Sequence, residues 1–133
     1  MQTLLRMPAR RLSEAVCLKV NALFEQSGAS LDSDARSVPP VCVTVRYLDG
    51  QPVTGLGSEN FSMVNAEDSS DLTHLFCVSG FASLQEAGVY EIAMQGATWS
   101  GCKTKSHCCL VYVTRFVPRS HAIEFGRVQC CMP

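Results

Sequence analysis

The sequence has none of the short motifs that many enzymes use for nucleophilic catalysis, phosphate binding or zinc-dependent hydrolysis. It contains no G-x-S-x-G elbow, no Gly-rich phosphate loop and no H-E-x-x-H pair. The histidines are His74, His107 and His121, and the one beside a cysteine, His107, would point away from Cys108 in a strand. We therefore expect a protein that is not an enzyme.

Long apolar runs are also absent. No stretch approaches the roughly 18 uncharged apolar residues of a membrane-spanning helix, so we expect no membrane span. Near the start of the chain, Arg6, Pro8, Arg10 and Arg11 interrupt the apolar core that a secretory signal needs. A complete chain is then expected in the cytoplasm, and a chain that lacks an upstream signal is expected to be exported or periplasmic.

Charge is sparse as well. Charged residues make up only 17% of the 133 residues, and the net charge is −1. The bases of the last third are dispersed, which is typical of a solvated surface, so we expect no nucleic-acid partner. A hydrophobic content of 47% excludes a disordered chain, and the length suits one domain with a single packed core.

Apolar residues near the N-terminus recur at spacings of three and four residues. They are Leu12, Val16, Val20, Leu23 and Phe24, which would form one stripe of an amphipathic helix from about residue 12 to residue 26. This pattern predicts an N-terminal helical segment, residues 1–28, that attaches the domain to a protein partner or to a second copy of the chain.

The pattern changes after a polar linker at residues 29–40. From Val41 the apolar period falls from about 3.6 to about 2, and we expect strands at 41–48, 61–64, 72–79, 88–95 and 108–117. The connections supply no crossover helices, so we expect antiparallel strands without parallel pairing. The expected fold is mainly β, an antiparallel sandwich at residues 41–117 preceded by the helix and followed by a C-terminal extension at 118–133.

Two segments carry a resemblance to a known class of domain. The run from Val41 to Met63 contains an alternating strand, the turn Asp49-Gly-Gln-Pro-Val53 and an Asn60-Phe61 step into the next strand, and residues 87–94 read Ala-Gly-Val-Tyr-Glu-Ile-Ala-Met. This combination resembles bacterial immunoglobulin-like β-sandwich modules. The resemblance implies the sandwich fold and places Tyr90 near a corner where the chain returns to the core.

Cysteine is abundant, with 8 in the chain and five of them between residues 102 and 131. No C-x-x-C pair occurs, but Cys102, His107, Cys108 and Cys130 form an irregular set of candidate zinc ligands, with Cys109 as the alternative to Cys108 and Cys131 beside Cys130. Two other interpretations stay open, namely disulfide pairing and burial of the cysteines as small hydrophobic residues. We expect no cofactor unless this set binds zinc.

Trp99 is the only tryptophan and lies in a loop bounded by Gly96 and Gly101. Exposed, it would anchor a partner, and buried, it would close one end of the sandwich. The function expected from the whole sequence is a non-enzymatic β-sandwich module for protein–protein interaction or assembly, with the helix stripe and Trp99 as candidate binding residues. The alternative is a thiol-rich metal-binding or redox protein that uses the C-terminal cysteines and His107.

Overall fold

The computed structural model describes residues 14–25, 38–73, 80–93 and 107–131. The described part is mainly β, as expected. Its elements, in chain order, are β1 (Glu14–Phe24), β2 (Val41–Tyr47), the 3-10 turn η1 (Ser58–Asn60), β3 (Phe61–Asn65), β4 (Phe81–Ser83), β5 (Val89–Ile92), β6 (Cys108–Val117) and β7 (Ala122–Cys131).

All seven strands belong to one sheet in the order β3-β6-β7-β1-β2-β5-β4. Most neighbours are antiparallel, but β1 and β7 run parallel, with Ala15 opposite Ile123 and Cys17 opposite Phe125. The sheet is therefore mixed, and the expectation of no parallel pairing was wrong. The strands that pair in parallel are the first and the last of the described chain, so the whole domain between them serves as the crossover that a parallel pair requires.

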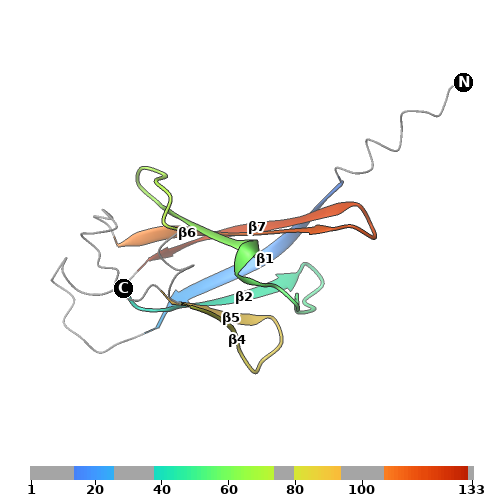
Figure 1. Cartoon of the computed structure of the whole chain (residues 1–133), viewed down its shortest axis with the longest axis horizontal. Helices are drawn as coiled ribbons and strands as arrows, with labels where there is room; N and C mark the ends of the chain where they lie inside the picture. The colour runs from blue at the N-terminus through green and yellow to red at the C-terminus, as the bar shows by residue number, and fades with distance from the viewer. Residues whose placement is uncertain (1–13, 26–37, 74–79, 94–106, 132–133) are drawn as a thin grey trace, which may run out of the picture.

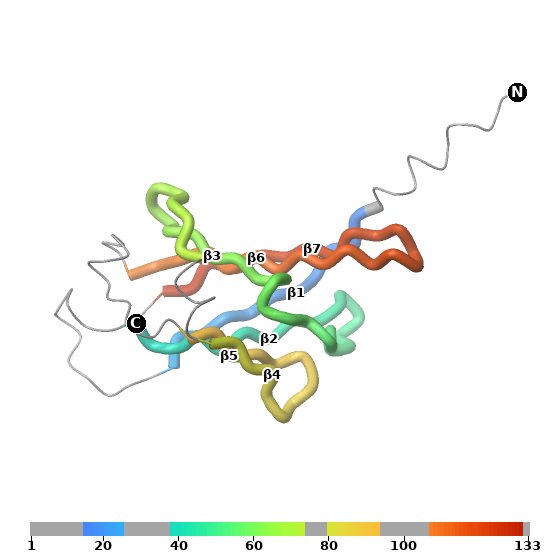
Figure 2. The backbone as a smooth tube through the Cα atoms, in the orientation of Figure 1, coloured from blue at the N-terminus to red at the C-terminus, as the bar shows by residue number. Residues whose placement is uncertain are grey.

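The sheet curls into a half-barrel. In Figures 1 and 2, β6 and β7 lie in an upper layer, β2, β5 and β4 lie in a lower layer, and β1 runs between the two. The edge strands β3 and β4 are brought together by their aromatic rings, since the centroids of Phe61 and Phe81 are 5.2 Å apart and those of Phe61 and Tyr90 are 5.4 Å apart. Ring pairs of this kind contribute on the order of 1 kcal/mol beyond the area that they bury.

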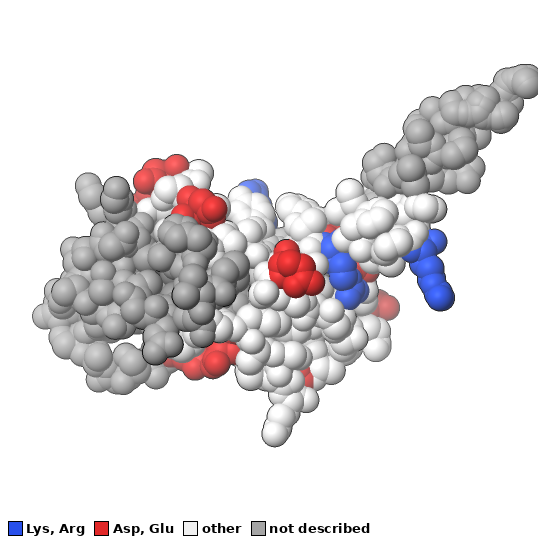
Figure 3. Space-filling model, viewed as in Figure 1, with Lys and Arg blue, Asp and Glu red and all other residues white. Residues whose placement is uncertain are grey.

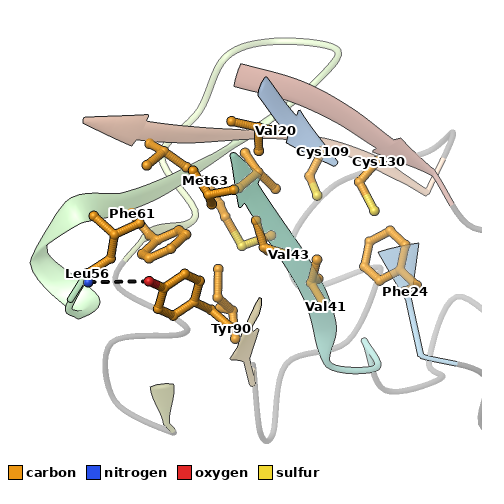
Figure 4. Packing of buried hydrophobic residues seen from close by; sticks show 14 of the residues in the cluster. Val20, Phe24, Val41, Val43, Leu56, Phe61, Met63, Tyr90, Cys109 and Cys130 are labelled. Atoms are coloured by element: carbon orange, nitrogen blue, oxygen red, sulfur yellow. Dashed lines mark hydrogen bonds between the residues drawn. The ribbon is translucent and has the colours of Figure 1, made fainter. Parts of the chain in front are cut away.

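The core lies inside this curl and follows directly from the period of 2. On β2, Val41, Val43 and Val45 are fully buried, whereas the residues between them are half-exposed. Met63 of β3 faces this row from the other side (Figure 4). Met63 is fully buried, as are Val111 and Val113 of β6 in the same core cluster. Burying one such side chain contributes about 1.5–3 kcal/mol relative to leaving it in water, so the alternating strands supply the main driving force.

The N-terminal helix is not found where it was predicted. Residues 14–24 form β1, which pairs antiparallel with β2 from Leu18 opposite Tyr47 to Phe24 opposite Val41. Leu18, Val20 and Phe24 are buried in the core and Ala22 packs against it, whereas the alternate residues Lys19, Asn21 and Leu23 are exposed. The period of the segment is thus 2, and as a strand it pairs with β2 and β7 while burying its apolar side chains in the core, which outweighs the marginal stability of a short helix.

The expected division of the chain also needs correction. β1 and β7 are neighbours in the middle of the sheet, so residues 14–24 are not a separate helical segment and residues 122–131 are not an extension of a domain at 41–117. β7 forms a ten-residue antiparallel pairing with β6, from Cys108 opposite Cys131 to Val117 opposite Ala122. The strands predicted at 41–48, 61–64, 88–95 and 108–117 correspond to β2, β3, β5 and β6. Of the strand expected at 72–79, residues 74–79 lie outside the described residues.

Gly126 lets β1 cross closely over β7. Beyond the parallel pairing with β7, β1 passes to its partner β2, and Leu18 and Val20 lie against Gly126. A Cβ on Gly126 would lie 2.8 Å from the carbonyl oxygen of Leu18 and 2.7 Å from Cγ2 of Val20. Only glycine fits at this crossing without a shift of backbone, which explains a glycine in the middle of a strand.

Candidate functional site

The C-terminal cysteines come together at the open end of the β6–β7 hairpin. Cys108 and Cys131 are directly opposite in the register and form a disulfide. One step further along the strands, Cys109 and Cys130 are also directly opposite. Because successive side chains of a strand point to opposite faces, the disulfide lies on the outer face of the sheet and the second pair lies on the inner face.

Cys109 and Cys130 are part of the hydrophobic core, with 1% and 2% of their surface exposed. Their side chains lie next to each other, with both sulfur atoms on the side of Phe24 and Val41 (Figure 4). A hydrogen bond from the Cys109 side chain lowers the pKa of the Cys130 thiol, and a hydrogen bond from the Phe24 backbone acts in the same direction, against the opposing effect of burial. The two thiols thus behave as one interacting pair, in which the contact with Cys109 favours the thiolate of Cys130.

The predicted zinc ligands do not converge in the described part of the chain. Cys108 is engaged in the disulfide, and Cys130 lies on the opposite face of the sheet. His107 directly precedes β6 with a left-handed backbone (φ 58°), and Cys102 lies outside the described residues. Within residues 14–25, 38–73, 80–93 and 107–131, no group of three His, Cys, Asp or Glu side chains is placed to hold a metal ion. The zinc set stays a prediction, and it would require Cys108 to be reduced.

The other described cysteines differ in reactivity. Cys42 is half-buried on β2, where burial and then the carboxylates of Glu25 and Glu91 raise the pKa of its thiol. A raised pKa leaves little thiolate, so Cys42 is a poor nucleophile. Cys17 is exposed on the outer face of β1. Cys77 lies outside the described residues.

The predicted partner-binding stripe is divided between the two faces of β1. Val16 is half-buried, Val20 and Phe24 are buried in the chain's own core, and only Leu23 points outward, with 73% of its surface exposed. As a continuous binding surface the stripe was wrong, because a strand places odd and even positions on opposite faces. Leu12 and Trp99 lie outside the described residues.

A different apolar surface lies on the outer face near the turn between β6 and β7. Phe116, Ile123 and Phe125 are 53%, 36% and 42% exposed. Phe116 and Ile123 are directly opposite in the register, and Phe125 is two residues from Ile123 on the same face. Cys17 pairs with Phe125 from β1, and the ring of Tyr112 lies 6.5 Å from that of Phe125. We call these five residues the outer apolar patch.

The surroundings of the outer apolar patch are basic. Among the outward-facing positions of β1, β6 and β7, Lys19 and Arg127 are the charged residues, and no carboxylate occurs at these positions. The face of the molecule seen in Figure 3 carries scattered charges of both signs and a broad uncharged area between them. The outer face of the three strands therefore combines exposed aromatic rings with positive charge.

A buried charged group lies on the inner side of the same hairpin and was not expected from the sequence. Glu124 of β7 is only 7% exposed and accepts hydrogen bonds at Oε1 from Nε of Arg115 (2.9 Å) and at Oε2 from the hydroxyl of Tyr47 (2.7 Å). Nη1 of Arg115 donates to the carbonyl oxygen of Thr54 (2.8 Å). The cluster joins β6 and β7 to β2, and its donors and acceptors satisfy one another, which is typical of a structural ion pair.

Comparison of the chain with family models, with curated proteins and with solved structures finds no match. Among the described residues, no helix is long and apolar enough to cross a membrane. The strands thus position two candidate functional features, the exposed outer apolar patch and the cysteine pairs at the end of the β6–β7 hairpin.

Proposed function

We propose that the protein is a non-enzymatic interaction module that binds a partner protein through the outer apolar patch. The observation that carries the proposal is the exposure of Phe116 and Phe125 at neighbouring outward positions of β6 and β7, at 53% and 42%. Aromatic side chains on a rigid sheet lose little conformational entropy on binding and are enriched among the residues that dominate binding energy. Contiguous exposed apolar surface of this kind commonly marks an interaction site.

Charge favours a different protein over a second copy of the chain. A symmetric dimer through this face would bring Lys19 and Arg127 of one copy toward the same bases of the other, since a two-fold interface uses one patch twice. Like charges in an interface are costly, whereas opposite charges favour encounter and orientation. The partner that fits is a protein segment with apolar side chains flanked by carboxylates.

We also propose that the fold is an immunoglobulin-like sandwich module. Two layers of alternating strands around one core support this assignment, as does the turn after β2. In that turn Gly50 has a positive φ of 94°, its N–H donates to the carbonyl oxygen of Tyr47 (2.9 Å), and Pro52 forms a bridge with Arg46. The Tyr90 hydroxyl donates to the carbonyl oxygen of Val53 (2.6 Å), which fastens β5 to the segment after this turn.

The disulfide between Cys108 and Cys131 bears on the compartment. Disulfides persist where the environment is oxidising and are kept reduced in most cytosols. This supports the exported or periplasmic alternative over a cytoplasmic location. Mass spectrometry of the protein recovered from its native source would test the proposal, because a reduced Cys108 and Cys131 in that material would count against export.

The binding proposal is tested with designed peptides in which leucine and phenylalanine alternate with glutamate, labelled for fluorescence anisotropy. Phe116→Ser and Phe125→Ser are each expected to weaken binding by about tenfold or more, which corresponds to about 1.4 kcal/mol or more. Leu48→Ser is the matched control, because Leu48 is 69% exposed but lies in the turn after β2. A peptide with lysine in place of glutamate is expected to bind more weakly, and added salt is expected to weaken the glutamate peptide.

Alkylation of Cys17 is a second test of the proposal, because it blocks the patch without changing a residue of the core. Cys17 is exposed and paired with Phe125, so a bulky maleimide there is expected to block the same peptides, whereas Cys17→Ser with maleimide is expected to bind them normally. Equal binding by the Phe125→Ser variant and the unmodified chain would contradict the proposal. Concentration-dependent sedimentation that disappears in Phe125→Ser would instead assign the patch to a second copy.

A further inference from the structure

The end of the β6–β7 hairpin carries two cysteine pairs in consecutive register positions, and one of them is not oxidised. Cys108–Cys131 is a disulfide, and the neighbouring pair, Cys109 and Cys130, consists of two thiols. The interaction module proposed above makes no use of either pair.

The Cα–Cα distance between directly opposed residues of an antiparallel pair of strands determines whether Cys109 and Cys130 can form a disulfide. Directly opposed residues alternate between narrow pairs, with Cα atoms about 4.5 Å apart, and wide pairs, with Cα atoms about 5.5 Å apart. The Cα atoms of Cys108 and Cys131 are 4.1 Å apart, which makes theirs a narrow pair and the next one a wide pair. A wide pair lies inside the range of about 4.4–6.8 Å over which disulfides join two Cα atoms.

We propose that Cys109 and Cys130 are a buried dithiol that is oxidised by a low-molecular-weight disulfide, such as glutathione disulfide, to a second cross-strand disulfide on the inner face of the hairpin. The geometry that carries this is their direct opposition in the register, their shared burial and the common direction of their sulfur atoms (Figure 4). Core packing holds the two side chains next to each other. Formation of the bond between their sulfur atoms therefore requires only rotation of the two side chains.

The reaction proceeds in two exchange steps. The Cys130 thiolate attacks one sulfur of the small disulfide, forms a mixed disulfide with that half and releases the other half as a thiolate. The Cys109 thiolate then attacks the Cys130 sulfur, forms the Cys109–Cys130 bond and releases the second half. The protein loses two thiol protons and two electrons, and the small disulfide gains them as two thiols.

Cys130 is assigned the first attack because its environment favours the thiolate. The hydrogen bonds from the side chain of Cys109 and from the backbone of Phe24 lower the pKa of Cys130 despite its burial, whereas burial and nearby carboxylates raise the pKa of Cys42. The thiol that attacks the small disulfide must become transiently accessible, and Cys130 is the second-last residue of β7, where strand ends open most readily.

The two faces of the sheet keep the pairings distinct. Cys108 and Cys109 are adjacent but point to opposite faces, as do Cys130 and Cys131, so exchange between the outer disulfide and the inner dithiol would require the strands to slip. Two disulfides at consecutive positions are compatible with a single register of β6 and β7. Oxidation would thereby fix this end of the hairpin on both faces.

The experiment uses the full chain with Cys108–Cys131 intact, equilibrated in glutathione buffers of increasing oxidation, quenched with N-ethylmaleimide and digested with trypsin. Cleavage after Lys105, Arg115 and Arg127 releases peptides 106–115 and 128–133, which contain both pairs and stay joined by Cys108–Cys131. The joined peptides are expected to carry two maleimide groups in reducing buffer and none in oxidising buffer. The species without maleimide is expected to be lighter than the joined dithiol by two hydrogen atoms, and reduced glutathione is expected to restore the two thiols.

Variants separate the pair from its neighbours. Cys109→Ala is expected to leave Cys130 either alkylated or bound to glutathione at every buffer composition, and Cys42→Ala is expected to behave like the unmodified chain. In Cys108→Ser/Cys131→Ser, oxidation is expected to raise the midpoint of thermal unfolding, because Cys109–Cys130 then supplies the only closure of the hairpin loop. Addition of Cys109→Ala to that double variant is expected to abolish the rise.

Two results would overturn the proposal. One is the persistence of both alkylated thiols in the joined peptides at the most oxidising buffer. The other is glutathione retained on Cys130 while Cys109 remains a thiol, which would show that the second exchange does not occur. Since no binding measurement enters this test, its failure would leave the proposed interaction module untouched.

Discussion

Arg115 on β6 and Glu124 on β7 form a buried ion pair, with Nη2 of Arg115 2.8 Å from Oε1 of Glu124. The two residues are directly opposite in the register, and both point inward next to the turn of the hairpin. Tyr47 adds a third contact from β2, because its hydroxyl donates to the other oxygen of the same carboxylate. The ion pair thus fixes how the hairpin packs against the opposite layer of the half-barrel.

Replacing Glu124 with glutamine is expected to lower the free energy of unfolding by on the order of 2 kcal/mol, because it leaves a partly buried guanidinium without its counter-charge. The loss is smaller than for a fully buried pair, since the Arg115 side chain keeps 24% of its surface exposed. Urea denaturation at neutral pH measures the change. A double-mutant cycle with Arg115→Met isolates the coupling between the two side chains, and a coupling indistinguishable from zero would contradict the interpretation.

The ionisation of Tyr47 is expected to make the protein less stable at alkaline pH. Burial, followed by the hydrogen bond to Glu124, raises the pKa of Tyr47 above its ordinary value of 10.0. The unfolded chain therefore releases this proton at lower pH than the folded chain, so the stabilising contribution is present below about pH 10 and is lost as the pH rises through the folded pKa. Denaturation curves from neutral pH to above pH 10 should fall more steeply for the unmodified chain than for Tyr47→Phe. Parallel slopes would show that Tyr47 is not the group responsible.

Tyr90→Phe is expected to cost about 1–2 kcal/mol, because it removes a hydrogen-bonding partner from buried backbone groups. The Tyr90 hydroxyl accepts from the N–H of Leu56 (3.4 Å; Figure 4) and donates to the carbonyl oxygen of Val53 (2.6 Å), and Tyr90 itself is 1% exposed. Thermal or urea unfolding measures the loss. Tyr112→Phe is the control, because Tyr112 lies half-exposed on the outer face, and an equal effect of both changes would count against the role given to Tyr90.

Gly126→Ala is expected to destabilise the protein by roughly 1–3 kcal/mol, because a side chain at the crossing of β1 over β7 forces the two strands apart. The added Cβ would lie 2.8 Å from a backbone oxygen of β1, which cannot move as a flexible side chain would. Gly50→Ala is an informative contrast, since Gly50 has a positive φ but nothing within 4 Å of its added Cβ. Because β1 lies so close to Gly126, Gly126→Ala is expected to alter the packing of the core, which near-ultraviolet circular dichroism would detect. Gly50→Ala is expected to change the stability without changing that spectrum.

The strands that alternate strongly could be predicted from the sequence, and one that alternates weakly could not. β2 has Val41, Val43 and Val45 at successive inward positions and β6 has Val111 and Val113, so the period of 2 is visible in both segments. β7 places Ala122, Glu124 and Gly126 at inward positions, where an apolar pattern is hardly visible. Its strand character comes from its partners, because Glu124 is neutralised by Arg115 and Gly126 makes room for β1.

The error at β1 has a simple geometric cause. Val16, Val20 and Phe24 are spaced by four residues, and a separation of four places side chains on one face both in a helix and in a strand. Leu18 distinguishes the two, since it continues the inward face of a strand but leaves the stripe of a helix. The segment adopts the strand because β2 and β7 offer hydrogen-bonding partners on both of its sides.

The sequence alone predicts that the chain is mainly β, that valine-rich segments near residues 41–47 and 108–117 form core strands, and that the last third concentrates the cysteines. These properties follow from local periodicity and composition. The folded structure was needed to show that Cys108 meets Cys131, that Cys109 meets Cys130 and that Phe116, Ile123 and Phe125 share an exposed face. Such relationships depend on the register between strands, and register is set by packing across the whole sheet, which no single segment encodes.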